Sequence, residues 1–375
     1  MSDAPTPTLI SRVDSFRVLS GVNASVRILR VCSAVVQMLG VNTLHKELLK
    51  EKMMAWSKDL SQNEDYAERD GTLTREGGKP TTAFEHYLSF LQSLKWISVQ
   101  GDAVRNSRLG FLLGDLIKKT SSTDLALSSA EKLFYLHQLF KHDADTLLTL
   151  LGMLSQGGFS KKADLQEKFD NEQSERWKQK QRYADFFSKD LIWEAEKDIR
   201  FKSKPVKDEK LRHKHLVPTR LAWLEDLGIL SPKPFRLTDS GQHFFDLLPT
   251  LPESDTKEIN HLWLEHNAAE AFYRLALPTT PFQLWRELPL DVKSKRLAPL
   301  LKNADALFGN DGAMRLPFYA TLLYLSISLA STHHILAELA DLASTLENNF
   351  PVEGREYSAR RAARENESYI TYNLR

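Results

Sequence analysis

The stretch at 223–248, WLEDLGILSPKPFRLTDSGQHFFDLL, decides the fold that we predict for this chain. Apolar residues recur at helical spacing up to Gly228, which can end a helix because glycine readily takes the positive φ of a helix C-cap. The segment 229–237 then predicts two short paired strands, and Thr238 with Gly241 leads into a further helix. We therefore expect a helix, a hairpin and a helix in this order.

A closely similar pattern occurs about 130 residues earlier in the chain. The segment 90–98 aligns with 223–231, apolar on apolar and polar on polar. After a gap of two residues the match resumes, with Val104 matching Phe235, Ser107 matching Thr238 and Gly110 matching Gly241. The first copy departs from the second in having Lys95 at the position of Gly228. Because internal repetition outweighs the interpretation of any single segment, we expect two modules in tandem.

Both copies resemble winged helix-turn-helix modules. In such modules a helix ends in a leucine followed by a glycine, and a two-stranded wing comes next. A threonine and a glycine then begin the final helix. The resemblance covers about 20–117 and 128–249 of this chain. It implies small helical units that bind duplex DNA with the helix before the wing, or that dock on other proteins.

We predict a mainly α protein with two winged-helix-like modules, each with a short β-hairpin wing, and a C-terminal all-α domain. Only 16 glycines and 15 prolines in 375 residues favour long helices over turn-rich β architecture. The expected parts are a flexible N-terminus (1–19), a first module (20–122), a second module with a helical insertion (123–250), a helical C-terminal domain (251–350) and a flexible tail (351–375). The C-terminal helical domain is the expected site of partner binding or homodimer formation.

The single cysteine, Cys32, excludes an internal disulfide framework and a cysteine-based zinc cluster, and it favours a reducing, cytoplasmic setting. The N-terminus lacks the pattern of a signal peptide. The segment 316–337 contains no Asp, Glu, Lys or Arg and is long enough to cross a bilayer. It also contains Ser326, Ser328 and His333, so a buried core helix is the preferred interpretation and no membrane partner is expected.

Local charge indicates where DNA would bind. The chain carries a formal net charge of only +1, so affinity for nucleic acid must come from a local patch. Between Arg200 and Arg220 there are eight basic residues against two acidic ones, directly before the helix that leads into the second wing. The residues predicted to contact duplex DNA are Lys202, Lys204, Lys207, Lys210, Arg212, Lys214, Thr219, Arg220 and Arg236. Thr219 and Arg220 are expected near the base edges, and the lysines on phosphates.

The first module has a different pattern of charge. The helix before its wing has Glu85, Ser89 and Gln92 among its polar residues and no lysine or arginine before Lys95. This helix would bind phosphate poorly, so protein docking or scaffolding is at least as good an interpretation for this copy. The alternative function is accordingly that of a scaffold subunit in a bacterial assembly for chromosome maintenance or phage defence, with the wings docked on other chains.

Catalytic interpretations find little support, and we expect no enzyme activity, metal or cofactor. The sequence Gly77-Gly78-Lys79-Pro80 is not a phosphate-binding loop, because Pro80 stands where a magnesium-binding serine or threonine is needed. The histidine pairs His213 with His215, His261 with His266 and His333 with His334 lack further ligands at suitable spacing. Asp198, Asp208 and Lys210 imitate the acidic set of a metal-dependent nuclease, which we keep as a remote alternative.

Overall fold

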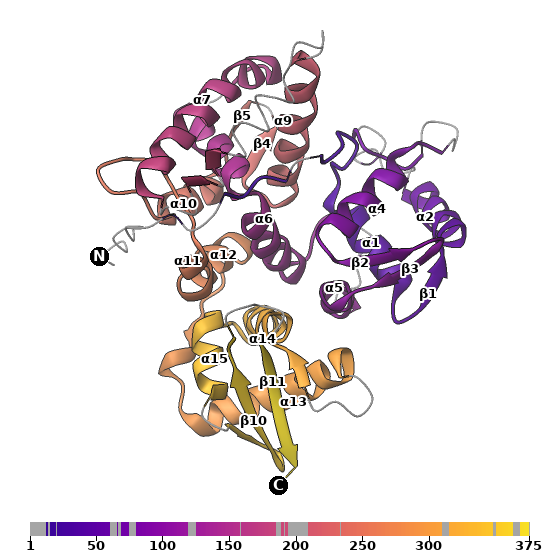
Figure 1. The fold of residues 1–375 in the computed structure, drawn as a ribbon, viewed down its shortest axis with the longest axis vertical. Coiled ribbons are helices and arrows are strands. Elements are labelled where there is room, and N and C mark those ends of the chain that lie inside the picture. Colours follow the sequence, from indigo (N-terminus) through magenta and orange to yellow (C-terminus); the bar gives the residue numbers. More distant parts are fainter. Residues whose placement is uncertain are drawn as a thin grey trace. The chain divides into compact units, whose positions relative to one another are not determined.

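A computed structural model describes residues 13, 16–19, 21–60, 66, 69–74, 80–118, 125–157, 159–184, 189–190, 192–193, 209–232, 234–309, 315–347, 350–362 and 368–374. For 209–215 and 374 only the backbone is described. The chain is mainly helical, as predicted (Figure 1). It divides into two compact units. Unit 1 comprises Met1–Leu29, Glu68–Thr72 and Tyr135–Leu264, and unit 2 comprises Arg30–Ala67, Leu73–Phe134 and Glu265–Arg375.

The first copy of the repeat lies in unit 2 and contains more strands than predicted. Its elements are α1 (Leu29–Leu39), β1 (Thr43–His45), α2 (Lys46–Leu60), α4 (Ala83–Ser93), β2 (Ile97–Gln100), β3 (Ala103–Asn106) and α5 (Arg108–Lys118). Strands β2 and β3 form the predicted antiparallel hairpin. Strand β1, which the sequence interpretation missed, pairs with β3 to give a three-stranded sheet in the order β1-β3-β2.

The second copy lies in unit 1. Its elements are α6 (Ser129–Ser155, whose first residues belong to unit 2), α7 (Lys162–Tyr183), α9 (Glu209–Asp226), β4 (Leu230–Pro232), β5 (Phe235–Leu237) and α10 (Asp239–Leu247). The hairpin predicted within 229–237 is confirmed, because β4 and β5 pair in antiparallel register. Phe159, between α6 and α7, forms a further antiparallel bridge with Phe235.

The two copies share details of backbone hydrogen bonding at the helix end. The amide of Trp96 donates to the carbonyl of Leu91 at 2.9 Å, and the amide of Ile229 donates to the carbonyl of Leu224 at 2.8 Å. Lys95 has φ +58° at the position where Gly228 has φ +78°. The lysine therefore takes the left-handed conformation that the glycine takes without steric cost.

The copies also agree where the last helix packs against the hairpin. Ser107 and Thr238 donate their amides to the carbonyls of Trp96 and Ile229, both at 2.9 Å. A Cβ on Gly110 would lie 2.3 Å from the carbonyl oxygen of Trp96, and one on Gly241 would lie 2.1 Å from that of Ile229. Leu44 pairs with Val104 as Phe159 pairs with Phe235, so the repeat extends back to the strand that the sequence comparison missed.

The C-terminal part of unit 2 differs from the predicted all-α domain and flexible tail. Its elements are α12 (Ala268–Ala276), β6 (Gln283–Leu284), a 3-10 turn (Trp285–Glu287), α13 (Leu290–Phe308), β7 (Arg315–Pro317), α14 (Phe318–His333), β8 (Ile335–Leu336), α15 (Leu339–Glu347), β9 (Phe350–Val352), β10 (Arg355–Arg360) and β11 (Tyr369–Leu374). Four of these strands form an antiparallel sheet in the order β7-β11-β10-β9. The predicted all-α domain (251–350) and flexible tail (351–375) are therefore wrong. The alternation of buried and more exposed residues along β10 is typical of a strand with one face on a core.

Two further predictions concern the ends of apolar segments. The segment 316–337 is divided between β7, the 16-residue helix α14 and β8, and no helix among the described residues is long and apolar enough to cross a membrane. The N-terminus was predicted to be flexible over 1–19. Within that range Val13 bridges Ala184, and the amide of Arg17 donates to Asp145 at 2.7 Å, so the described part of this segment is held by the fold.

Candidate nucleic-acid interface

The predicted DNA contacts divide into three groups. Lys202, Lys204 and Lys207 lie outside the described residues, as do Asp198 and Asp208 of the nuclease alternative. Lys210, Arg212 and Lys214 occupy the first two turns of α9, where the backbone alone is described. Thr219, Arg220 and Arg236 are described in full.

Thr219 and Arg220 cannot contact DNA bases as predicted, because both are buried. Five consecutive residues of α9, 217–221, are buried, and five residues span more than one helical turn. The helix is therefore enclosed on all sides at this level. Arg220 is only 1% exposed. Its Nε donates to Asp143 Oδ2 at 2.7 Å and its Nη2 donates to the carbonyl of Leu19 at 2.6 Å, so its charge is used inside unit 1.

Asp143 is the acceptor around which this part of unit 1 is organised. It lies inside α6 with non-helical φ −137° and ψ 24°, where the helix kinks. Its Oδ1 accepts the amide of Leu19 at 2.8 Å while Oδ2 accepts Arg220. Burial raises the pKa of Asp143, and the ion pair with Arg220 opposes that rise. One carboxylate therefore joins the N-terminal segment, α6 and α9.

The C-terminal end of α9 is held in a similar way. Asp226 accepts the amide of Leu29 at 2.8 Å and Nη2 of Arg69 at 2.5 Å. Burial raises the pKa of Asp226 to about 6, although the charge of Arg69 acts in the opposite direction. Trp223 donates its indole N–H to the carbonyl of Val26 at 2.8 Å. These contacts hold the C-terminal end of α9 against its neighbours in unit 1.

The surface beside α9 carries charge of both signs. Arg236 is exposed on β5, and no carboxylate of the described residues neutralises it. Helix α7, which packs on α9, exposes one lysine, Lys168, in its first four turns against five acidic residues, Asp164, Glu167, Asp170, Glu172 and Glu175. Its last two turns expose the cations Lys178 and Arg182 instead. A phosphate backbone would be repelled by the first part of α7 and attracted by the last part.

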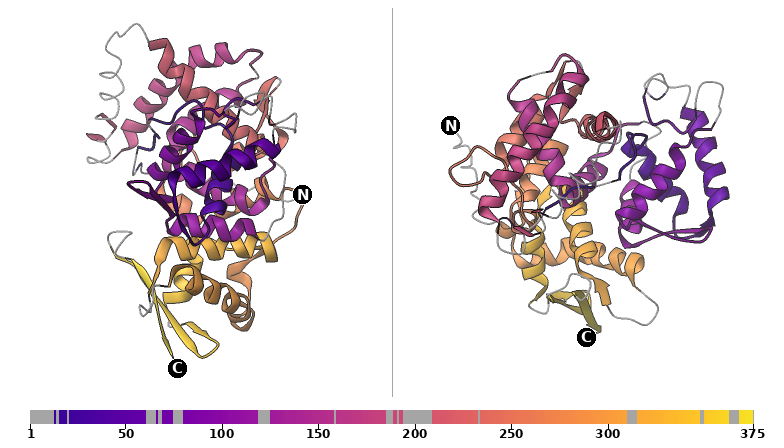
Figure 2. Two further views of the ribbon diagram at one scale, coloured as in Figure 1. Left: turned by 90° about the vertical axis from the view of Figure 1, so that its right-hand side faces the viewer. Right: turned by 45° about the horizontal axis from the view of Figure 1, so that its top comes forward.

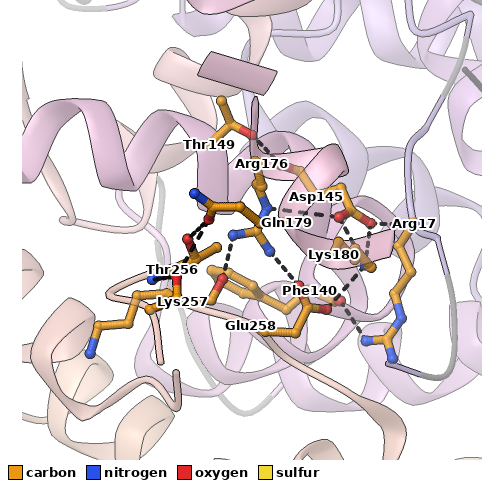
Figure 3. A network of polar contacts seen from close by, with 11 residues as sticks. Arg17, Phe140, Asp145, Thr149, Arg176, Gln179, Lys180, Thr256, Lys257 and Glu258 are labelled. Carbon is orange, nitrogen blue, oxygen red and sulfur yellow. Dashed lines mark hydrogen bonds and ion pairs between the residues drawn. The ribbon is translucent and has the colours of Figure 1, made fainter. Parts of the chain in front are cut away.

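Unit 1 also contains a buried ion network that the sequence interpretation missed (Figure 3). Lys180 donates to Asp145 Oδ1 at 2.8 Å and lies 3.0 Å from Glu258 Oε1. Arg176 donates to Glu258 Oε2 at 2.6 Å. Lys180, Asp145 and Glu258 are at most 1% exposed, and Arg176 is 7% exposed. Two carboxylates and two cations therefore neutralise one another, which fits a role in holding α6, α7 and the segment near 258 together.

A signal for this network was present in the sequence. The buried residues of α7 are Leu165, Phe169, Gln173, Arg176, Trp177 and Lys180. They follow the spacing of one helical face, so Arg176 and Lys180 occupy positions where an amphipathic helix places apolar residues. A cation at such a position requires a buried carboxylate as partner, because an unpaired buried charge is costly.

The remaining candidate sites do not come together in the described residues. His261 and His266 both belong to α11 (His261–His266), His333 lies 3.2 Å from Arg296, and His334 lies 3.3 Å from the hydroxyl of Tyr273. Among the residues that the structure describes, no group of three or more His, Cys, Asp or Glu side chains is placed to hold a metal ion. Comparison with protein family models, with curated proteins and with solved structures found no match to this chain.

Proposed function

We propose that this protein binds duplex DNA through unit 1, with the first turns of α9 and the β4–β5 hairpin toward the phosphate backbone. The observation that carries the proposal is the place of the basic segment, since Lys207, Lys210 and Lys214 precede or begin the helix that leads into the hairpin. The order helix, bridge, helix, helix, hairpin, helix is that of a winged-helix module, which supports α9 as the helix that approaches DNA. Arg236 adds an exposed cation on the hairpin.

The burial of Thr219 and Arg220 limits what this interface can read. Sequence is read by side chains that reach base edges in a groove, whereas lysine and arginine contacts to phosphate carry no sequence information. With the middle of α9 enclosed, its first turns supply phosphate contacts. The proposed binding is therefore strongly dependent on salt and weakly dependent on sequence.

The test is a salt titration of duplex binding, followed by fluorescence anisotropy. We expect Lys207→Ala/Lys210→Ala/Lys214→Ala to weaken binding and to flatten the log–log salt dependence by up to about 2.7, since each phosphate contact contributes about 0.9. The control Arg286→Ala/Lys295→Ala/Lys302→Ala removes the same charge from exposed positions of unit 2. An unchanged slope in the first variant would refute the interface.

A second candidate function, protein docking, is favoured by the first copy of the repeat. Helix α4 exposes Glu85, Ser89 and Gln92, and Glu85 is already paired with Lys46 at 2.6 Å. This surface offers little to phosphate. If α4 docks on another chain of the same assembly, Ser89→Arg should remove that chain from nuclease-treated complexes purified from native cells, while the α9 triple variant should retain it.

A further inference from the structure

The four-stranded sheet of unit 2 has two different faces. Its inner residues, Leu316, Tyr357, Ala359 and Ile370, are buried, and helices α13, α14 and α15 pack against its strands. Successive residues of a strand point to opposite faces. Arg315, Ser358, Arg360, Tyr369 and Thr371 therefore share the other face, and all five are half-buried or exposed. We call these five residues the outer face. Strands β10 and β11, which are yellow in Figure 2, carry four of them.

An aromatic ring lies between two cations at the centre of the outer face. Tyr369 on β11 is directly opposite Arg360 on β10. From the other side, the guanidinium of Arg315 on β7 lies 4.7 Å from the ring centroid of Tyr369. Two strand spacings separate β10 from β7, about 10 Å, so the two arginines can contact different phosphates of one strand.

These two arginines differ from the other arginines of the same sheet. Arg355 pairs with Asp305 at 2.9 Å, and Arg361 pairs with Glu265 at 3.2 Å. Within the described part of the chain, neither Arg315 nor Arg360 has a carboxylate partner. Glu356 shares this face of β10 among the described residues, and it lies four residues from Arg360, or about 13 Å. Among the described residues, therefore, no carboxylate pairs with the two arginines beside Tyr369.

We propose that the outer face binds a single strand of nucleic acid. Arg315 and Arg360 would hold phosphates, and a base would stack on the Tyr369–Arg315 pair. Proteins bind single strands by combining a basic surface with aromatic side chains, and every base has a face that can stack. A duplex keeps its base faces stacked inside, so it cannot use the tyrosine in this way. The proposed site is separate from α9 and does not depend on the proposed duplex binding.

The experiment measures anisotropy of a fluorescein-labelled oligothymidylate with the full chain. We expect Arg315→Ala/Arg360→Ala to weaken binding at least tenfold and to flatten the log–log salt dependence by about 1.4, the value for two contacts to a single strand. Tyr369→Ala should weaken binding at least about fivefold, as loss of one stacked base does, whereas Tyr369→Phe should bind like the parent. Arg286→Ala/Lys302→Ala, which removes the same charge elsewhere in unit 2, is the control.

The outcomes separate this inference from the proposed function. Each variant is measured on duplex and on single strand, and thermal unfolding verifies that it is folded. Unchanged single-strand affinity in Arg315→Ala/Arg360→Ala would overturn the proposed binding site on the outer face. The absence of any binding to oligothymidylate would do the same. If only the α9 triple variant loses single-strand binding, the single strand binds at α9, and the proposed outer-face site is also overturned. Duplex results for the α9 variant decide the proposed function by themselves.

Discussion

Replacing Lys180 with methionine tests whether the buried ion network holds unit 1 together. Methionine has nearly the length and volume of the lysine stem, so the change removes the charge without opening a large cavity. Lys180 contacts both carboxylates, at 2.8 Å and 2.9 Å from the oxygens of Asp145 and 3.0 Å from Glu258. Without it, the charge of Arg176 faces two buried carboxylates, at 2.6 Å from Glu258 and 3.8 Å from Asp145. Breaking a buried pair in this way costs about 3–5 kcal/mol of unfolding free energy.

The assay is urea unfolding followed by circular dichroism, with Lys178→Met as the matched control. Lys178 lies on the same helix, is 54% exposed and pairs with Glu175, so its loss should cost at most about 0.5 kcal/mol. In thermal unfolding, Lys180→Met should lower Tm by about 6–20 °C, the range for a domain of 150–250 residues. Adding Glu258→Gln to Lys180→Met should restore part of the stability, because it leaves one buried carboxylate, Asp145, against the one cation Arg176. Equal stabilities of the two lysine variants would refute the reasoning.

Three further predictions concern single buried residues. Arg220→Met should destabilise unit 1 by about 3–5 kcal/mol in urea unfolding, because it leaves Asp143 buried without its ion-pair partner. The affinity of the folded variant for duplex DNA should not change, and a loss of affinity would show that Arg220 contacts DNA. Gly241→Ala should lower the free energy of unfolding by at least about 1–3 kcal/mol, because its Cβ would meet the carbonyl of Ile229 at 2.1 Å. The control Gly152→Ala, which has open space around it in α6, should stabilise the helix by up to about 1 kcal/mol. Equal effects of the two variants would contradict the close approach. Burial raises the pKa of Glu338 to about 8 from 4.5, so between these pH values the folded state keeps a proton that the unfolded state loses, and the stability falls as the pH rises. Glu338→Gln should remove up to about 1.4 kcal/mol per pH unit of that fall. An unchanged pH dependence of urea unfolding in the variant would show that the carboxyl is ionised in the folded state.

Local signals in the sequence predicted the local structure well. Both hairpins form, and Lys95 takes the positive φ of the glycine that it replaces. Ser128 and Glu131 have the spacing of a helix capping box, and the box forms in both directions, with hydrogen bonds of 3.0 Å and 3.2 Å. Thr82 and Glu85 have the same spacing, but the side chain of Thr82 does not cap its helix. These features depend on a few neighbouring residues, so a sequence interpretation can reach most of them.

Features that depend on distant partners could not be predicted in this way. Arg220 ends a run of basic residues and looks like part of it, but its partner Asp143 is 77 positions away along the chain. The strands of the predicted tail were hidden by their outer residues, since Glu356, Arg360 and their neighbours make a half-buried strand look like a charged tail. A strand of this kind differs from a charged tail in that one of its faces is buried, and the fold as a whole decides that burial.

The close approach of Gly110 and of Gly241 to a carbonyl oxygen has an evolutionary consequence. It occurs at equivalent places in two copies whose surfaces differ, since α4 pairs its Glu85 with Lys46 while α9 begins in a run of cations. A scaffold that tolerates such divergence allows one copy to change its ligand while the other keeps the older one. Replacing the exposed residues of α4 with the basic residues that begin α9 would test whether a difference in binding lies in these residues or in the shared scaffold.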